Sequence, residues 1–222
     1  MPKYILACLL TLGTLAAQNV FAGQAKISFV AGTVKVGTAG KMNAATVETP
    51  VASGETVSTA GDSAAILVLE DGSEIKLNAN TEFTVKGVAP NAEFNLEKGG
   101  VFSKIKKLRP NESFRIHAKT AVMGVRGTHF FAALSKKAGV EADLWMCVHE
   151  GSVEVESLVT HQKVAVPEGQ GVYIKGGKDI TPPKPYSWTK GLNWNMDPKK
   201  GNVLNKKGLD NEYSDLLEKD YD

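Results

Sequence analysis

Cysteine is nearly absent from this sequence, since Cys8 and Cys147 are the only two in 222 residues. Two cysteines cannot build a disulfide framework or a four-sulfur zinc site. A charge excess is also missing, because 26 Lys and Arg side chains face 24 Asp and Glu, for a formal net charge of +2. That charge is too small for the broad positive field that nucleic-acid binding requires. The rest of the composition is that of an ordinary globular chain, which excludes disorder, collagen and coiled coil.

Long apolar runs are absent except near the N-terminus. Lys3 precedes an apolar stretch from Tyr4 to Ala17, and Val20-Phe21-Ala22 resembles a signal-peptide cleavage site. At about 14 residues, the stretch is shorter than the roughly 20 that a membrane-spanning helix needs. The sequence therefore predicts a signal peptide at residues 1–22, cleaved after Ala22. The mature chain is expected to be periplasmic or secreted and to have no membrane span.

Short alternating segments fill the chain from Ala25 to Lys178, and no helical period occurs there. This pattern predicts an all-β domain over residues 25–178. The turn spacing, near a dozen residues, favours a sandwich or jelly roll, with a short β-roll or solenoid as the alternative. Strands are expected, among others, at Ala92–Glu97, Val101–Ile105, Ser113–His117, Thr128–Leu134, Ala142–Val148, Ser152–Glu156, Lys163–Val166 and Gly171–Ile174.

The dipeptide Asp71-Gly72 indicates a β-hairpin. Asp and Gly accept the positive φ that both central positions of a two-residue type I′ turn require. With that turn, Glu70 pairs with Ser73, Val68 with Ile75, and Ile66 with Leu77. Asp62 after Gly61 is likewise expected to be a turn residue rather than a calcium ligand.

The sequence changes character after Lys178. The segment Thr181-Pro182-Pro183-Lys184-Pro185 cannot continue a central strand, because proline lacks the amide donor. Residues 179–222 are therefore expected to form an irregular tail, with a short helix over Asp210–Asp222. Trp188 and Trp194 in this tail are expected either to pack on the domain, which we favour, or to contact a partner.

Three segments of the sequence form a recognisable combination. They are GETVSTAGDSAAILVLEDGSEIKL at 54–77, SFRIHAKTAVMGVRGTHFFAAL at 113–134, and VHEGSVEVES at 148–157, which VPEGQGVYI at 166–174 follows. Together these segments resemble a FecR domain. The resemblance covers about residues 30–175. Its most diagnostic residues are Val125, Arg126, Gly127, Thr128 and Phe130, with Glu150 and Gly151 in support.

The resemblance implies an extracytoplasmic β module. In the iron-uptake regulators of this family, such a module belongs to an inner-membrane protein that responds to an outer-membrane transporter and controls a sigma factor. This chain has a predicted cleavable signal in place of the sigma-binding segment and spanning helix. It resembles instead the stand-alone secreted FecR-domain proteins.

Arg126 lies between Gly124 and Gly127, at an expected bend between two apolar runs. An arginine at such a bend usually directs its guanidinium at a carboxylate or at free carbonyls. The favoured interpretation is a structural clamp, with Asp62 or Glu150 as the partner, and the alternative is a ligand anchor. The binding residues proposed from the sequence are Arg126, Thr128, Trp188 and Trp194.

Catalytic motifs are missing from the sequence. Cys147 and His149 share one face of an expected strand, with His129 on a neighbouring strand as a third candidate metal ligand, but burial of Cys147 in the run Leu144–Val148 is the favoured interpretation. His117 and His161 are dispersed, and no nucleophile elbow, zinc-protease motif, phosphate loop or dinucleotide fingerprint occurs. No catalytic residue, metal or cofactor is therefore assigned.

These observations together predict an exported, non-catalytic FecR-domain protein that binds a protein or a glycan in the bacterial cell envelope, in a signalling or regulatory role. The first alternative is a structural envelope scaffold without a regulated ligand. A metal-dependent enzyme is the lesser alternative.

Overall fold

The computed structural model describes residues 24–134 and 143–204 of the chain. The predicted signal peptide and the predicted helix over Asp210–Asp222 lie outside these residues. No helix in the described ranges has the length and apolar character to cross a membrane.

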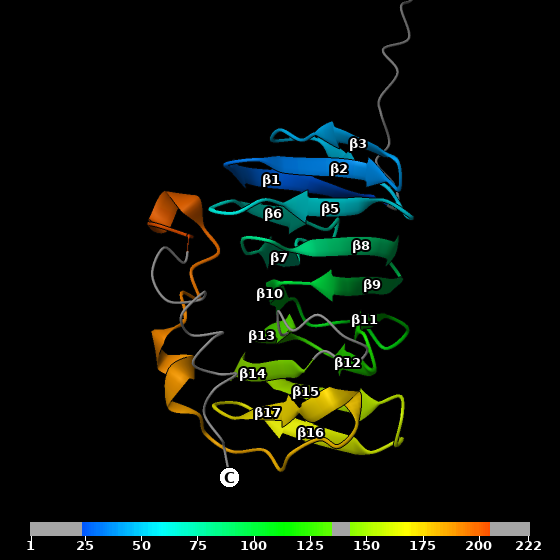
Figure 1. Ribbon diagram of the computed structural model, residues 1–222, viewed down its shortest axis with the longest axis vertical. Coiled ribbons are helices and arrows are strands. Elements are labelled where there is room, and N and C mark those ends of the chain that lie inside the picture. The colour runs from blue at the N-terminus through cyan, green and yellow to red at the C-terminus, as the bar shows by residue number, and fades with distance from the viewer. Residues whose placement is uncertain (1–23, 135–142, 205–222) are drawn as a thin grey trace, which may run out of the picture.

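Two open β-sheets lie face to face, and the strands of each are stacked like rungs along the long axis of the molecule (Figure 1). One sheet has eight strands in the order β17-β14-β13-β10-β7-β6-β1-β4, and the other has nine in the order β16-β15-β12-β11-β9-β8-β5-β2-β3. The all-β prediction is confirmed. The chain passes back and forth between the sheets as it advances along the stack, so the sandwich also has the winding of a solenoid.

The strands have the following bounds: β1 Ala25–Ala31, β2 Val34–Thr38, β3 Lys41–Ala44, β4 Pro50–Val51, β5 Thr56–Thr59, β6 Ala64–Val68, β7 Glu74–Leu77, β8 Glu82–Gly87, β9 Asn91–Lys98, β10 Gly100–Ile105, β11 Ser113–Ala118, β12 Ala121–Val125, β13 Thr128–Leu134, β14 Leu144–Glu150, β15 Ser152–Ser157, β16 Lys163–Pro167 and β17 Gly171–Ile174. The eight strands named from the sequence are confirmed to within two residues at each end. Among the described strand pairs, β9 with β11 is the parallel one.

The main core lies between the two sheets. Along β9, buried residues alternate with more exposed ones, as a strand with one face on a core requires. Phe94 of β9 stacks on Phe83, with ring centroids 5.2 Å apart, and lies 5.1 Å from the ring of Phe114. These inward faces fix the register of the nine-stranded sheet, because a shift of one residue exposes every aromatic ring.

The hairpin around Asp71-Gly72 is longer than predicted. Leu69 donates to the carbonyl of Ser73, and Leu67 is opposite Ile75. The predicted register, with Val68 opposite Ile75, is therefore wrong by one residue. Gly72 alone of the loop residues has positive φ, at 78°, so a type I turn is followed by a left-handed glycine.

Asp71 stabilises this longer loop. Its carboxylate accepts hydrogen bonds from the backbone N–H and the hydroxyl of Ser73, each at 2.8 Å. Side-chain capping of this kind favours the three-residue connection over the type I′ turn. The change of register places Leu67 and Leu69 on the core face with Ile75 and Leu77, whereas Lys76 lies on the outer face of the eight-stranded sheet in either register.

The chain after β17 crosses the outer face of the eight-stranded sheet. We call residues 180–204 the strap. It begins beside β17, through bridges of Ile180 to Ile174 and of Lys184 to Gly171. It then runs back along the stack to the level of β7 and β6 (Figure 1), through short 3₁₀ turns η2 (Ser187–Gly191) and η3 (Pro198–Lys200), which follow η1 (Lys175–Gly177).

A second apolar cluster forms under the strap. Leu192 and Met196 of the strap are buried against residues of the sheet, namely Phe102, Phe131, Ala133, Trp145 and Cys147. Part of the outer face of the eight-stranded sheet is therefore buried in this second apolar cluster. The favoured prediction, that the tail packs on its own domain, agrees with this arrangement.

Candidate functional site

Arg126 occupies the turn between β12 and β13 and is exposed. It forms no ion pair or hydrogen bond with any described residue, so the predicted clamp onto Asp62 or Glu150 is not present. Gly127 follows with φ of 108°, and a Cβ on it would lie 3.0 Å from the Cα of Lys107. The glycine therefore lets the loop after β10 approach the turn, while the guanidinium is left free toward solvent.

The Glu150-Gly151 turn packs on the Arg126-Gly127 turn. A Cβ on Gly151, which has φ of 87°, would lie 2.7 Å from the carbonyl oxygen of Gly127. Thr128 is buried and its hydroxyl donates to the carbonyl of Ser152 at 2.9 Å. These contacts explain why glycine follows the charged residue in both turns.

The other residues that the sequence analysis singled out lie in the core or in turns. Phe130 and Val125 are buried in the main core. Asp62 has φ of 55° and follows Gly61 in the turn before β6, as expected for a turn residue. Gly72 makes room for the ammonium of Lys106, which lies where a Cβ would otherwise be.

These turns line a groove of about 620 Å³. The basic groove, as we call it, is formed by the β6–β7 hairpin, the end of β10 and the loop after it, and the turns that contain Arg126 and Glu150. Its charged lining residues are four bases and two acids, namely Lys104, Lys106, Lys107, Arg126, Glu74 and Glu150. The local formal charge is therefore about as large as that of the whole chain.

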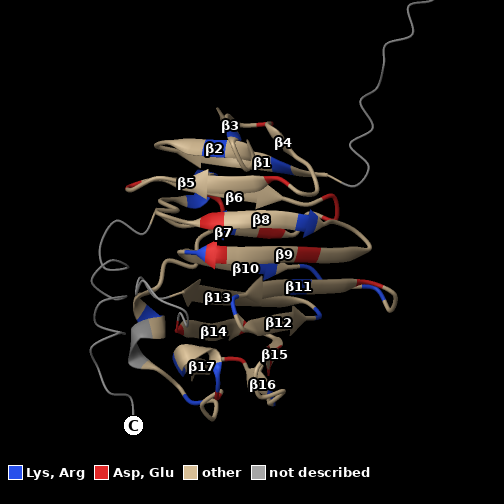
Figure 2. Cartoon of the chain, turned by 45° about the vertical axis from the view of Figure 1, so that its right-hand side comes forward, with Lys and Arg blue, Asp and Glu red and all other residues tan. Residues whose placement is uncertain are grey.

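The bases of the groove differ from the charges on the outer face of the nine-stranded sheet. There, acidic and basic residues alternate over β8 and β9 (Figure 2), and ion pairs join neighbouring strands. Examples are Lys98 to Glu82 at 2.7 Å and Lys163 to Glu156 at 3.1 Å. Within the described ranges, no carboxylate lies within ion-pair distance of a base of the groove, although Glu74, opposite Lys104 on β7, interacts with Lys104 and Lys106 at longer range.

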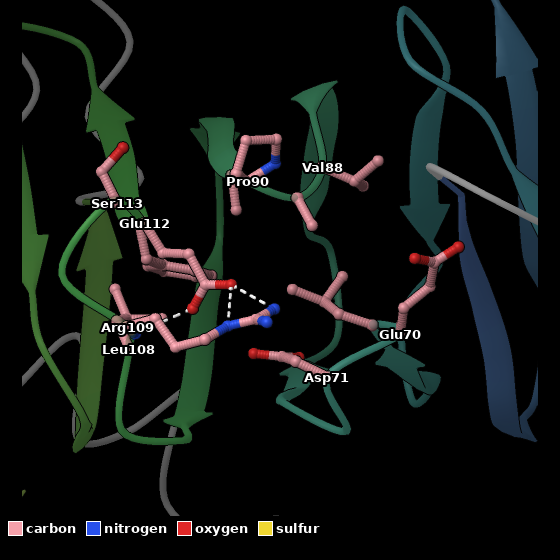
Figure 3. Close-up of a pocket in the computed structure, with 12 residues that line it drawn as sticks. Glu70, Asp71, Val88, Pro90, Leu108, Arg109, Glu112 and Ser113 are labelled. Carbon is pink, nitrogen blue, oxygen red and sulfur yellow. Dashed lines mark hydrogen bonds and ion pairs between the residues drawn. The ribbon is translucent and has the colours of Figure 1, made fainter.

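A smaller pocket of about 250 Å³ is lined in part by the loop after β10 (Figure 3). Its apolar lining comes from both sheets and from the loops between them, namely Leu69, Val88, Ala89, Pro90, Ala92, Leu108 and Phe114, and the acids Glu70 and Asp71 also line it. We call it the apolar pocket. Arg109 and Glu112 lie at its rim, with a guanidinium-to-carboxylate distance of 2.6 Å. Hydrogen bonds from the backbone and side chain of Arg109 hold the pKa of Glu112 below its usual value, so the rim stays charged.

Trp194, a residue of the strap, meets the ring of His129, which lines the groove, edge-on at 5.0 Å. Its ring stacks on that of His149 at 4.6 Å and meets Phe102 edge-on at 5.2 Å. Trp188 lies in η2, and the structure does not describe its side chain. The structure thus brings Arg126, Thr128 and Glu150 together at the groove, and Trp194 lies next to them, against the groove residue His129.

The strap also covers a buried lysine. The Lys76 ammonium donates to the carbonyls of Asn193 and Asn195 and lies 4.2 Å from the centroid of the Phe102 ring. Burial lowers the pKa of Lys76 to about 7. His129 is buried beside it, and desolvation, with the nearby His149 charge, lowers the pKa of His129 to about 4. The burial of this lysine has no local signal in the sequence, because it depends on strap residues 117 positions further along the chain.

The histidines and Cys147 do not form a metal centre. In the described ranges, no three His, Cys, Asp or Glu side chains converge as metal ligands. His129 and His149 are neighbours, with ring centroids 5.2 Å apart, whereas Cys147 is buried in the apolar cluster under the strap. Burial raises the pKa of the Cys147 thiol, which keeps it protonated and unreactive.

Sequence reasoning missed Lys104, Lys106 and Lys107. The signal was the run Lys104-Ile105-Lys106-Lys107-Leu108-Arg109, where a strand with an inward-facing Ile105 passes into a basic loop. Its meaning depends on the strand order, because β7, β10 and β13 are neighbours only in the folded sheet.

Comparison with known proteins identifies part of the chain. The family model described as FecR protein matches residues 55–154. No curated protein matches the chain. Two crystal structures of a candidate anti-sigma factor from Parabacteroides distasonis share the fold, each with a TM-score of 0.52. Their identities are 16% and 18%, over 61% and 65% of this chain and 63% and 69% of theirs, so the chain spans less than two thirds of the first.

Proposed function

We propose, from the FecR domain that the chain carries at residues 55–154, that the protein is an exported, non-catalytic binding module of the cell envelope with a signalling or regulatory role. The partner we propose is a protein. A glycan and a constitutive scaffold role are the alternatives that the experiment below separates.

One observation supports this proposal above the others. The basic groove and the apolar pocket are lined wholly by residues between 69 and 150, which all lie inside the family match. Concave sites with a few convergent polar groups are the usual binding sites of proteins. Arg126 is the proposed binding residue of this face, because it is exposed and has no ion-pair partner among the described residues.

We assign different roles to the other binding residues proposed from the sequence. Thr128 positions the Arg126 turn through its hydrogen bond to Ser152. Trp194 holds the strap on the sheet through its aromatic contacts. Trp188 stays a proposed second contact from the strap. We also propose that the folding unit extends beyond the predicted boundary at Lys178, because residues 180–204 complete the second apolar cluster.

Affinity capture from a detergent-solubilised envelope extract tests the proposal. The bait is the full mature chain, beside a groove variant, Lys106→Glu with Arg126→Glu, and a control variant, Lys35→Glu with Arg115→Glu. The control residues are exposed on β2 and β11, outside the basic groove. One dominant protein that is held by the wild type and the control, and lost by the groove variant, is the expected result.

Three other outcomes contradict parts of the proposal. A partner that all three baits retain would place binding elsewhere on the molecule. Retention of a glycan instead of a protein would favour the glycan alternative. A partner bound in constant stoichiometric amounts under every growth condition would favour the scaffold.

A further inference from the structure

Five consecutive residues of the strap, 192–196, lie on the outer face of the eight-stranded sheet, and we call them the latch segment. Leu192 and Met196 are buried in the second apolar cluster. Trp194 lies between them in the sequence and meets the Phe102 ring edge-on at 5.2 Å. Because every second residue contacts the sheet, the latch segment packs as an extended chain with one side on an apolar surface.

The intervening residues, Asn193 and Asn195, bond in two directions. Their carbonyls accept from the Lys76 ammonium, at 2.6 and 2.9 Å. Their side-chain amides donate to the carbonyl of Asn202, at 2.8 and 3.2 Å, which closes this part of the strap into a loop. The strap is therefore organised by hydrogen bonds of its own, while apolar contacts and one buried cation attach it to the sheet.

A second titratable group lies under the latch segment. His129 of β13 is 7% exposed, and Trp194 meets its ring edge-on at 5.0 Å. The Nε2 atom of His129 is buried and has no hydrogen-bond partner among the residues that the structure describes. Protonation of the ring would place a charged N–H group there without an acceptor, which costs far more free energy than burial of the neutral ring.

The charges around His129 also oppose its protonation. Burial is the largest cause of its lowered pKa of about 4, and the charges of His149, Lys104 and Lys76 on the neighbouring strands add to it. The other charged residues of this side of the molecule are Arg126, Glu74 and Glu150 of the groove, and Asp197 and Lys200 of the strap. Within residues 24–134 and 143–204, no carboxylate forms an ion pair with the His129 side chain.

Lifting the latch segment returns Lys76 and His129 to water. The pKa of Lys76 then rises from about 7 toward 10.5, and that of His129 from about 4 toward 6.5, because burial is what lowers both. The open state therefore binds more protons than the closed state, through His129 below about pH 6.5 and through Lys76 above about pH 7. Acidification accordingly favours the open state, and both groups act in the same direction.

We propose that the strap is a latch that acid releases. At neutral pH the latch segment covers Phe102 and Cys147, with Lys76 and His129 beneath it. On acidification His129 takes up a proton, and the latch segment leaves the sheet and uncovers this apolar face. Because His129 also lines the basic groove, release changes one wall of the groove. Only this consequence for binding rests on the proposed function.

Labelling of Cys147 with a pyridyl disulfide reagent, which reacts with thiols in acid, measures release. Cys147 lies in the cluster under the latch segment and is the single thiol of residues 23–222. The native rate at each pH is divided by the rate of the same chain unfolded in urea, which removes the reactivity of the thiol itself. We expect this ratio to rise by about thirtyfold or more from pH 7.5 to pH 5, as a pKa that moves from about 4 to 6.5 on opening requires.

Two neutral variants and one control identify the trigger. His129→Phe keeps an aromatic ring beside Trp194 but cannot take up a proton, and His129→Gln is the second neutral variant. Both should show only the smaller rise, below about fivefold, that Lys76 supplies near pH 7. His117→Gln is the matched control, because His117 pairs with Glu93 at 2.8 Å on the opposite sheet, and it should behave as the wild type.

Three outcomes would overturn the inference. The first is a labelling ratio that stays constant between pH 7.5 and pH 5. The second is a rise that both His129 variants retain in full. The third is an equal loss of hydrogen-exchange protection in β9 and β11 over the same pH range, because it would show that the whole domain unfolds. All these measurements use the chain alone, so their failure leaves the proposed function to be judged by the capture experiment.

Discussion

The ammonium of Lys76 donates a hydrogen bond of 2.6 Å to the backbone carbonyl of Asn193, 117 residues further along the chain. Lys76 has no exposed surface, and a second bond, of 2.9 Å, reaches the carbonyl of Asn195. A cation in the middle of the eight-stranded sheet is thus bound to the backbone of the strap. This contact joins the FecR-matched segment to a part of the chain outside that segment.

The buried position of Lys76 predicts a stability that rises with pH. Its pKa is lowered to about 7 in the folded protein and is near 10.5 in the unfolded chain, so the unfolded state binds more protons between these values. The free energy of unfolding should therefore increase from pH 7 toward pH 10, by at most about 1.4 kcal/mol per pH unit. Below pH 7 both states are protonated, and the contribution is constant.

Lys76→Met is the variant that isolates this effect. Chemical denaturation at several pH values between 7 and 9.5 should show a slope for the wild type that the variant lacks. The variant is also expected to be less stable, by about 1–3 kcal/mol, because two strap carbonyls lose their donor. Equal pH slopes for the two proteins would show that Lys76 is not the titrating group.

The strap should protect Cys147 from modification. The thiol has 1% exposure and lies in the cluster that Leu192 and Met196 complete. We expect a thiol reagent to modify native residues 23–222 very slowly, and a chain truncated after residue 180 at least tenfold faster, since the sheet face loses its cover. Leu192→Ala should give an intermediate rate and lower the free energy of unfolding by about 2–3 kcal/mol. Equally slow modification of the truncated chain would mean that the strap does not cover this thiol.

Gly151 should be the most sensitive glycine of the two stacked turns. Alanine at this position combines the cost of a positive φ with a Cβ placed 2.7 Å from the Gly127 carbonyl oxygen. Gly169→Ala is the matched control, because Gly169 has φ of 75° and no atom within 4 Å of its Cβ position. Thermal or urea unfolding should show a loss of about 1–2 kcal/mol for the control and a clearly larger loss for Gly151→Ala. Equal losses would mean that the close approach of the two turns is unimportant.

Alternation of apolar residues was enough to predict the all-β class and most strand bounds, because each strand has one face on the core. The hairpin register was missed for a local reason. Asp71 bonds to Ser73 through its side chain and thereby selects a three-residue loop that the dipeptide alone does not indicate. Arg126 could be predicted to lie at a turn, but its surroundings depend on lysines of β10 and the loop after it. Sheet order brings these residues together, and no local pattern specifies that order.

Hydrogen exchange of the protein bound to its captured envelope partner tests the central claim most directly. The claim is that the face formed by the basic groove and the apolar pocket is the binding surface. We predict new protection at residues 69–74, 104–112 and 126–127, with the outer face of β8, β9 and β11 unchanged. Protection on that outer face, or at the sheet edges formed by β3 and β16, with residues 104–112 unaffected, would contradict the claim.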